Sequence, residues 1–264
     1  MSDLRREVRR AVRVAGFGAV TGVMLPAYLT HQALTAPAAR DVLRERWVGA
    51  WCTSLLELFG VCAHVRGARP PPGRGHLVVA NHRSTADILL LLRTFGGTMV
   101  SRADLARWPL VGAAARSVGT LFVDRSDAAS GATAVRHIRT KLVGGTTVIL
   151  FPEGTTFPDD DVRPFHAGAF VAALRSGADI VPVGIAYASG SGAAFVEESF
   201  PAHLARMAAA PPSRVAMCIG EPIAVEPGAR AAALRDRAHE RVQRLVREAR
   251  GVVDSREPAV LPST

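Results

Sequence analysis

From residue 76 onwards, short apolar runs alternate with longer segments of helical character. We predict strands at residues 76–80, 97–100, 120–123, 146–151, 180–188 and 214–219. Helices are predicted at residues 85–95, 104–118, 128–143, 168–176, 202–209 and 230–250, with a proline interrupting the second. Strands that are apolar along almost their whole length are typical of a parallel sheet buried on both faces. The alternation therefore predicts an α/β fold, with a mostly parallel sheet covered by helices on both faces.

The chain before residue 76 follows a different pattern. Five arginines lie in the first thirteen residues, and no residue from 14 to 39 is charged at neutral pH. Residues 14–34 have the length that a bilayer span needs, about 20 residues, but they contain three glycines and a proline. A second apolar stretch, residues 47–63, is interrupted by Glu57. Because basic residues flank the first stretch on both sides, we predict two apolar helices that dip into one leaflet, with arginines at the headgroups; the alternative is a helical hairpin packed on the domain.

The change of pattern divides the chain into four parts. Residues 1–64 form the predicted membrane-associating segment, and residues 65–75, rich in proline and glycine, are predicted to be a linker. Residues 76–250 form the α/β domain, and residues 251–264 a tail. A chain of 264 residues is long enough for one such domain with an appendage.

The composition limits the partners of the chain. The formal charge of +9 suits anionic membranes, acidic substrates or nucleic acid, but no basic strip is interleaved with aromatic residues, so nucleic acid is not expected. Nearly every basic residue is an arginine, a bias that raises the charge without a functional reason. The three cysteines lack metal-like spacing and are expected to be buried thiols in a reducing compartment. The cytoplasmic face of the inner membrane fits these features.

The segment ANHRSTAD, residues 80–87, carries the first candidate chemistry. Residues five apart on a regular helix point about 140° away from each other, so His82 and Asp87 would not meet within one helix. They meet if His82 lies in the turn after the strand and Asp87 lies in the first helical turn, with Ser84 as N-cap. The carboxylate would then fix the tautomer of the imidazole and raise its basicity. The alternative is a capping aspartate beside an unrelated histidine.

Three further segments place polar residues at strand ends. GTLFVDR ends in Arg125, which is suited to phosphate or to a surface ion pair. FPEGTT has a proline and a glycine that force a tight turn, which would hold Glu153 at the same sheet edge or simply in a turn. IVPVGI contains Pro182, which favours an edge strand or a bulge. Nucleophile-elbow, Walker A and dinucleotide-binding signatures are absent from the sequence.

ANHRSTAD, GTLFVDR, FPEGTT and IVPVGI, in this order, resemble the four motif blocks of the glycerolipid acyltransferase family, which includes the lysophosphatidic acid acyltransferases. The resemblance covers about residues 76–223. It implies that His82 is the general base and that Asp87 orients it, while Arg125 binds the acceptor phosphate. It also implies that Glu153, Gly154 and Thr155 shape the acceptor site. No metal or other cofactor is expected; the acyl donor would be acyl-CoA or acyl carrier protein, and the acceptor a membrane lipid.

Two positions depart from the family pattern. Thr156 stands where many members have an arginine after E-G-T, and His166 stands where many have a lysine. We expect acylation of lysophosphatidic acid to phosphatidic acid, with a lyso-aminolipid or a zwitterionic lysophospholipid as the alternative acceptor. Arg163 is close enough in sequence to compensate, whereas the acidic run 159–161 would repel phosphate if it folded inward; a solvated loop tip is the favoured interpretation of that run. A catalytically silent membrane-binding protein and a hydrolase that uses the same histidine are the competing classes.

Overall fold

The computed structural model describes residues 2–255 except 72, 109–110, 125–126 and 197. A single seven-stranded sheet forms the centre, in the order β1-β7-β6-β2-β5-β3-β4. Its strands are β1 (Val61–Arg66), β2 (Leu77–Ala80), β3 (Thr98–Arg102), β4 (Leu121–Val123), β5 (Val148–Leu150), β6 (Ile180–Tyr187) and β7 (Ser213–Ile219). Only the β6–β7 pair is antiparallel among the strand pairs of the described chain, so the predicted mostly parallel sheet is confirmed.

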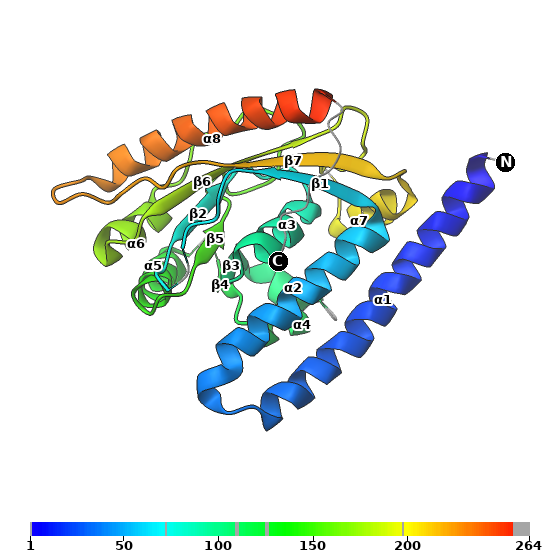
Figure 1. Ribbon diagram of the computed structural model, residues 1–264, viewed down its shortest axis with the longest axis horizontal. Coiled ribbons are helices and arrows are strands. Elements are labelled where there is room, and N and C mark those ends of the chain that lie inside the picture. The colour runs from blue at the N-terminus through cyan, green and yellow to red at the C-terminus, as the bar shows by residue number, and fades with distance from the viewer. Residues whose placement is uncertain (1, 72, 109–110, 125–126, 197, 256–264) are drawn as a thin grey trace.

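Helices cover both faces of the sheet (Figure 1). They are α1 (Ser2–Leu34), α2 (Arg40–Phe59), α3 (Thr85–Phe95), α4 (Val111–Ser117), α5 (Ala128–Val143), α6 (Gly168–Ser176), α7 (Phe200–Ala209) and α8 (Ala231–Asp254), with short 3-10 turns at Pro37–Ala39 and Ala103–Arg107. In β2, Val78 and Ala80 belong to the core under α2, α3 and α7. Leu77 and Val79 belong to the core under α5, α6 and α8. This alternation follows from the strand period of two and buries β2 on both faces.

Strand β1 was not among the predicted strands. Helix α2 ends at Gly60, whose φ of 68° is a left-handed conformation that glycine adopts without steric cost. The chain then turns directly into Val61–Arg66, which pairs in parallel with β7 at the edge of the sheet. Residues 65 and 66, predicted as the beginning of a linker, are therefore strand.

Pro182 lies in β6, between β7 and β2, so the predicted edge position is wrong. Its carbonyl oxygen accepts a hydrogen bond from the N–H of Gly220, at 2.9 Å, immediately beyond the last β7 residue that pairs with β6. The N–H and C=O of one strand residue point to the same side. The missing donor of Pro182 therefore faces the end of the β6–β7 ladder, where one reciprocal hydrogen bond is given up and the central ladder to β2 stays intact.

Helices α1 and α2 form a hairpin against the domain, with α1 also packing along α7. Arg9 donates to the carbonyl oxygen of Ala209 at 2.6 and 3.0 Å. Arg13, only 6% exposed, donates to the carbonyl oxygens of Leu58 at 2.9 Å and Ala210 at 2.6 Å. These carbonyls lie at the ends of α2 and α7, where helices leave acceptors unsatisfied. The predicted headgroup position is therefore wrong for Arg9 and Arg13, which fasten α1 to the domain.

Candidate active site

A four-residue loop joins β2 to α3 at the carboxyl end of the strand. Its first residue, Asn81, is buried and bonded to the neighbouring strand β6 in both directions. The Asn81 amide donates to the carbonyl oxygen of Ile185 at 2.9 Å and accepts from the N–H of Ile185 at 2.8 Å. These two hydrogen bonds continue the connection between β2 and β6 beyond the end of β2, so the loop leaves the sheet at a fixed position. His82 is the next residue.

Asp87, in the first turn of α3, accepts hydrogen bonds from the polar groups of this loop. Its Oδ2 lies 3.0 Å from Nδ1 of His82 and accepts the backbone N–H groups of Arg83 at 2.7 Å and Ser84 at 2.8 Å. Its Oδ1 accepts the hydroxyl of Tyr187 at 2.6 Å. Ser84 is the N-cap of α3 in a capping box, as predicted. Four donors and the helix N-terminus stabilise a carboxylate that has no exposed surface.

The position of His82 follows from these contacts. Because the Asp87 carboxylate accepts at Nδ1, the proton of the neutral imidazole lies on Nδ1, and Nε2 is the ring atom with a lone pair for proton abstraction. The imidazole stacks on the ring of Phe151 at a centroid distance of 3.7 Å and an interplanar angle of 7°. The side chain is 15% exposed, so the ring is held in place yet reachable. A histidine ordered in this way can serve as a general base.

Glu153 holds the same loop from the other side. Its Oε2 accepts the backbone N–H of His82 at 2.7 Å, and its Oε1 accepts the backbone N–H of Arg163 at 2.9 Å. Glu153 is 7% exposed, and this burial raises its pKa to about 7 although both hydrogen bonds act in the opposite direction. Both carboxylate oxygens are thus engaged by backbone, which suits a residue that positions the loop better than one that contacts an acceptor.

The structure gives fewer contacts for the other residues that were predicted to shape or bind the acceptor site. Gly154 adopts a φ of 90° in the turn after Glu153, a conformation that favours glycine, and Thr155 is exposed beside it. The backbone N–H of Phe157 donates to the carbonyl oxygen of His82 at 3.0 Å, so this turn lies against the His82 loop. Arg125 lies outside the described residues.

The acidic run 159–161 is the solvated tip that the sequence favoured at Asp159 and Asp161, which are exposed, but not at Asp160. Asp160 folds inward and pairs with Arg83 and, at 2.7 Å, with Arg250. Asp159 pairs with Arg163 at 2.8 Å while 48% of its side chain stays exposed, and Asp161 is exposed over 85% of its side chain. The reason is tertiary: Arg83 and Arg250, 77 and 90 residues away in the sequence, both donate to the Asp160 carboxylate.

A large apolar cleft opens beside the first turn of α3. Its empty volume is about 1370 Å³, including the part open to solvent. Thr85 and Ala86 line it at the end nearest the His82 loop. Helices α1, α2, α3, α4 and α7 and strand β4 supply the walls. Phe17, Trp51, Leu89, Val118, Phe122 and Leu204 are among the lining residues. Among the described residues, no group of three His, Cys, Asp or Glu side chains is arranged to hold a metal ion.

Sequence reasoning missed four residues that complete this site. Asn81 and Phe151 lie inside the segments ANHRSTAD and FPEGTT, each directly after the end of a strand, and that position was a signal for both. Tyr187 carried no such signal, and the inward position of Asp160 was considered but not favoured, because their partners are 100 and 77 residues away in the sequence.

Comparison with known proteins identifies the domain. A family model described as Acyltransferase matches residues 62–186. A lyso-ornithine lipid O-acyltransferase from Pseudomonas aeruginosa is 33% identical over 182 residues, which are 69% of this chain and 69% of that protein. A 1-acyl-sn-glycerol-3-phosphate acyltransferase from Neisseria gonorrhoeae is 28% identical over 54% of this chain and 56% of its own length.

The fold is also that of a solved structure. The crystal structure of the 1-acyl-sn-glycerophosphate acyltransferase from Thermotoga maritima superposes with a TM-score of 0.77. It covers 95% of this chain and 98% of its own at 24% identity, which shows a common fold. The family resemblance of the four motif blocks is thus confirmed by sequence relatives and by structure. The chain belongs to the acyltransferase family that these relatives represent, and it is an enzyme of that class.

Proposed function

We propose that this enzyme moves a fatty acyl chain from an acyl thioester to the hydroxyl of a lysolipid in the membrane. The observation that carries the proposal is the 3.0 Å contact between His82 and a fully buried Asp87, beside an apolar cleft large enough for an acyl chain. Nε2 of His82 takes the proton of the acceptor hydroxyl as its oxygen attacks the thioester carbonyl. The C–S bond then breaks, and the thiolate leaves with the proton from His82. Asp87 stabilises the imidazolium in between, and base catalysis of this kind contributes ~10²–10⁴ in rate.

The apolar cleft is the proposed site of the acyl chain. It reaches from Thr85, three residues after His82, along α3 to the hairpin of α1 and α2. An acyl chain in it would place its thioester carbonyl at the His82 end, where proximity adds to the rate. Acyl-CoA or acyl carrier protein is the proposed donor, and the mechanism needs no cofactor or metal.

The acceptor that we favour is a lyso-aminolipid, the chemistry named for the Pseudomonas aeruginosa relative. The guanidinium of Arg163, which was expected to compensate for Thr156 and His166, is paired with Asp159 and lies over the ring of Phe157 at 4.8 Å. A doubly charged phosphate would have to displace that pair. Lysophosphatidic acid, the acceptor predicted from the sequence and named for the Neisseria relative, is the second candidate, with Arg125 as its phosphate ligand.

The test is an acyl-transfer assay on detergent-purified protein. The donor is oleoyl-CoA or an acyl carrier protein loaded with an acyl chain. Lyso-aminolipid, zwitterionic lysophospholipid and lysophosphatidic acid are compared, each beside His82→Ala. Best turnover of the lyso-aminolipid, lost in His82→Ala, supports the proposal. Best turnover of lysophosphatidic acid leaves the mechanism standing and reverses the acceptor. Release of free fatty acid would show a hydrolase, and no turnover with any pair would contradict catalysis altogether.

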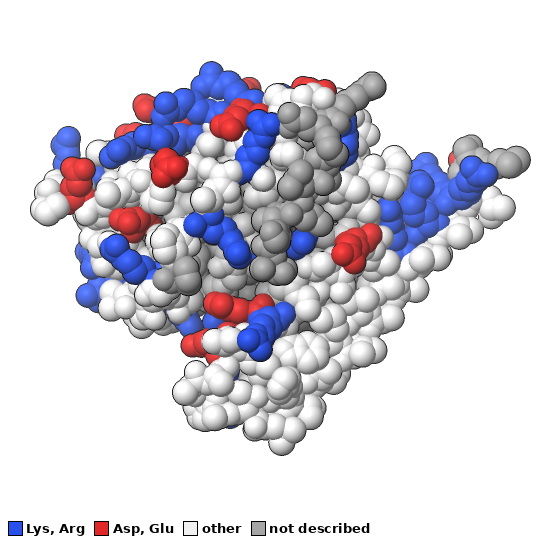
Figure 2. Space-filling view, viewed as in Figure 1, with Lys and Arg blue, Asp and Glu red and all other residues white. Residues whose placement is uncertain are grey.

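Attachment to the cytoplasmic face of the inner membrane through α1 and α2 is part of the proposal. The segment Asp3–Leu34 is the one helix of the described chain that is long and apolar enough to cross a membrane, and only 17% of its most apolar stretch is buried. Figure 2 shows an uncharged surface over most of the hairpin, with basic side chains gathered at the N-terminal end of α1. Because α1 packs on α2 and α7 along its length, it suits a helix that lies in one leaflet better than one that crosses the bilayer.

This attachment has its own test. Val23 is 70% exposed on the outer side of α1, and Val23→Asp should release the protein from vesicles of phosphatidylglycerol and phosphatidylethanolamine. Thr30 is exposed two turns after Val23 on the same helix, and Thr30→Asp measures the effect of a charge at this second position. Unchanged vesicle binding of both variants would contradict membrane contact through this face.

A further inference from the structure

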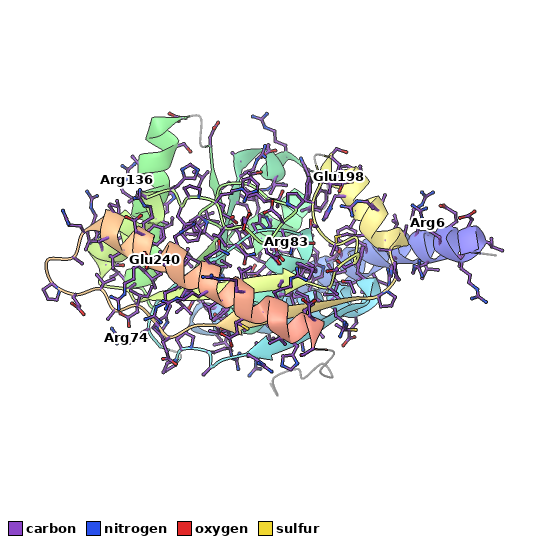
Figure 3. All side chains as sticks on the ribbon, turned by 90° about the horizontal axis from the view of Figure 1, so that it is seen from above. Arg6, Arg74, Arg83, Arg136, Glu198 and Glu240 are labelled. Carbon is purple, nitrogen blue, oxygen red and sulfur yellow. The ribbon has the colours of Figure 1, made fainter. Side chains whose placement is uncertain are left out.

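Asp160 lies between two arginines that come from distant parts of the chain. The guanidinium of Arg83 donates to Asp160 and to the carbonyl oxygen of Pro158, and Nε of Arg250 donates to Asp160 at 2.7 Å. Arg83 directly follows His82, whereas Arg250 is near the end of α8. In Figure 3, Arg83 lies near the middle of the molecule, in contrast to Arg6 on α1 and Arg136 on α5.

Both arginines are also linked to Asp87, the carboxylate that orients His82: Arg83 directly through its backbone, and Arg250 through Tyr187. The backbone N–H of Arg83 donates to Asp87 at 2.7 Å. Nη1 of Arg250 donates to the carbonyl oxygen of Tyr187 at 2.7 Å, and the hydroxyl of Tyr187 donates to the other oxygen of Asp87 at 2.6 Å. The Asp160 carboxylate therefore closes a ring of contacts around Asp87, made by the His82 loop, β6, α8 and the turn after β5.

This ring of contacts depends on Asp160 because its carboxylate offsets the charge of Arg83. The side chain of Arg83 is 9% exposed, and its Nε is buried without a hydrogen-bond partner among the described residues. The rest of its guanidinium is satisfied by Asp160 and Pro158. Removing one partner of a largely buried ion pair leaves an uncompensated charge, which the structure relieves by moving. The group that would move here is the neighbour of His82.

We propose that Asp160 is a positioning residue for acyl transfer: by pairing with Arg83 and Arg250, it fixes the loop that presents His82 to the substrates. The inference rests on the proposed function, because it concerns the rate of that reaction. Asp160 touches neither His82 nor the apolar cleft, so its effect falls on the chemical step and not on substrate binding.

The experiment compares Asp160→Asn with Asp161→Asn. Asp161 is the adjacent carboxylate, and its side chain is 85% exposed. Displacement of a catalytic group by about 1 Å can cost ~10²-fold in rate, so we expect kcat of Asp160→Asn to fall by about tenfold to a hundredfold, with the KM of donor and acceptor within about twofold. Asp161→Asn should keep kcat within about twofold, and Asp160→Glu, which retains the charge, should recover most of the loss.

The thermal midpoint of each variant shows whether it is folded. If Asp160→Asn does not fold, Arg250→Lys is compared with Arg247→Lys, one turn away and exposed; the inference then requires the larger loss of kcat in Arg250→Lys. Equal kcat for folded Asp160→Asn and Asp161→Asn, with an active wild type, would overturn the inference alone, as would a rise in KM without a fall in kcat. A wild type without transfer would overturn the proposed function and the inference with it.

Discussion

Ionisation of the buried Glu153 carboxyl destabilises the folded protein, and an isosteric substitution can measure this effect. Burial raises the pKa of Glu153 from 4.5 to about 7 in the folded protein, because desolvation disfavours the carboxylate more than its two backbone donors favour it. The folded chain therefore binds more protons than the unfolded chain between these two values. Stability from this group is fully present below pH 4.5 and is lost as the pH rises through about 7. The complete loss is about 3.4 kcal/mol, at about 1.4 kcal/mol for each pH unit between the two values.

Glu153→Gln keeps the shape of the side chain and removes its ionisation. Between pH 5 and pH 8, the free energy of unfolding of the variant relative to wild type should rise by about 2.5 kcal/mol. A pH-independent loss of about 1–3 kcal/mol is added, because the amide NH₂ group must face the backbone N–H of either His82 or Arg163. Urea unfolding in detergent, followed by tryptophan fluorescence at several pH values, measures both quantities, with the exposed Glu221→Gln as control.

Catalysis should respond differently from stability. The carboxylate accepts both backbone N–H groups, whereas the amide of Glu153→Gln accepts only one, so kcat of this variant at pH 8 should fall by about tenfold or more while the KM of the lipid acceptor stays nearly constant. A pH-independent difference in unfolding free energy between the variant and wild type would refute the reasoning about burial. A large rise in KM at unchanged kcat would refute the positioning role and restore Glu153 as an acceptor ligand.

Three further predictions concern the base, the core and the hairpin. Asp87→Asn should lower kcat by about 10²–10⁴ in the acyl-transfer assay, with KM little changed, because the imidazolium loses its carboxylate. Gly184→Ala should destabilise the protein by about 1–3 kcal/mol in urea unfolding, since its Cβ would lie 2.2 Å from the backbone carbon of Leu245, whereas Gly251→Ala, in open space on α8, should not. Arg13→Gln should cost about 1–3 kcal/mol through the unsatisfied helix-end carbonyls; equal stability of the exposed Arg10→Gln and Arg13→Gln would contradict that.

The parts of this protein that sequence predicts are those whose causes are local. The sequence predicts β2 and β5 because a short, continuous apolar run is by itself typical of a strand buried on both faces. The meeting of His82 and Asp87 was predictable because a strand end and a helix cap lie within seven residues of each other. Their distance of 3.0 Å agrees with that argument.

The remaining features depend on partners that are distant in the sequence. Val61–Arg66 becomes a strand because β7, about 150 residues later, offers it an edge. Pro182 was predicted at an edge or in a bulge because the pattern alone does not show that the β6–β7 ladder ends beside its nitrogen. In both cases the tertiary pairing, and not the local pattern, decides the position that the residues take in the sheet.

The acidic run shows why the acceptor is harder to infer than the reaction. Taken alone, residues 159–161 are three carboxylates in a polar loop, for which a solvated tip is the ordinary expectation. In the structure, Asp160 offsets the charge of Arg83 and Arg250, and Asp159 offsets that of Arg163. The arginines nearest the described part of the site are therefore already neutralised by this protein's own loop. Catalysis needs only His82 and its orienting carboxylate, which one segment encodes, whereas the headgroup preference is set by the balance of charges between segments that meet only in the folded chain.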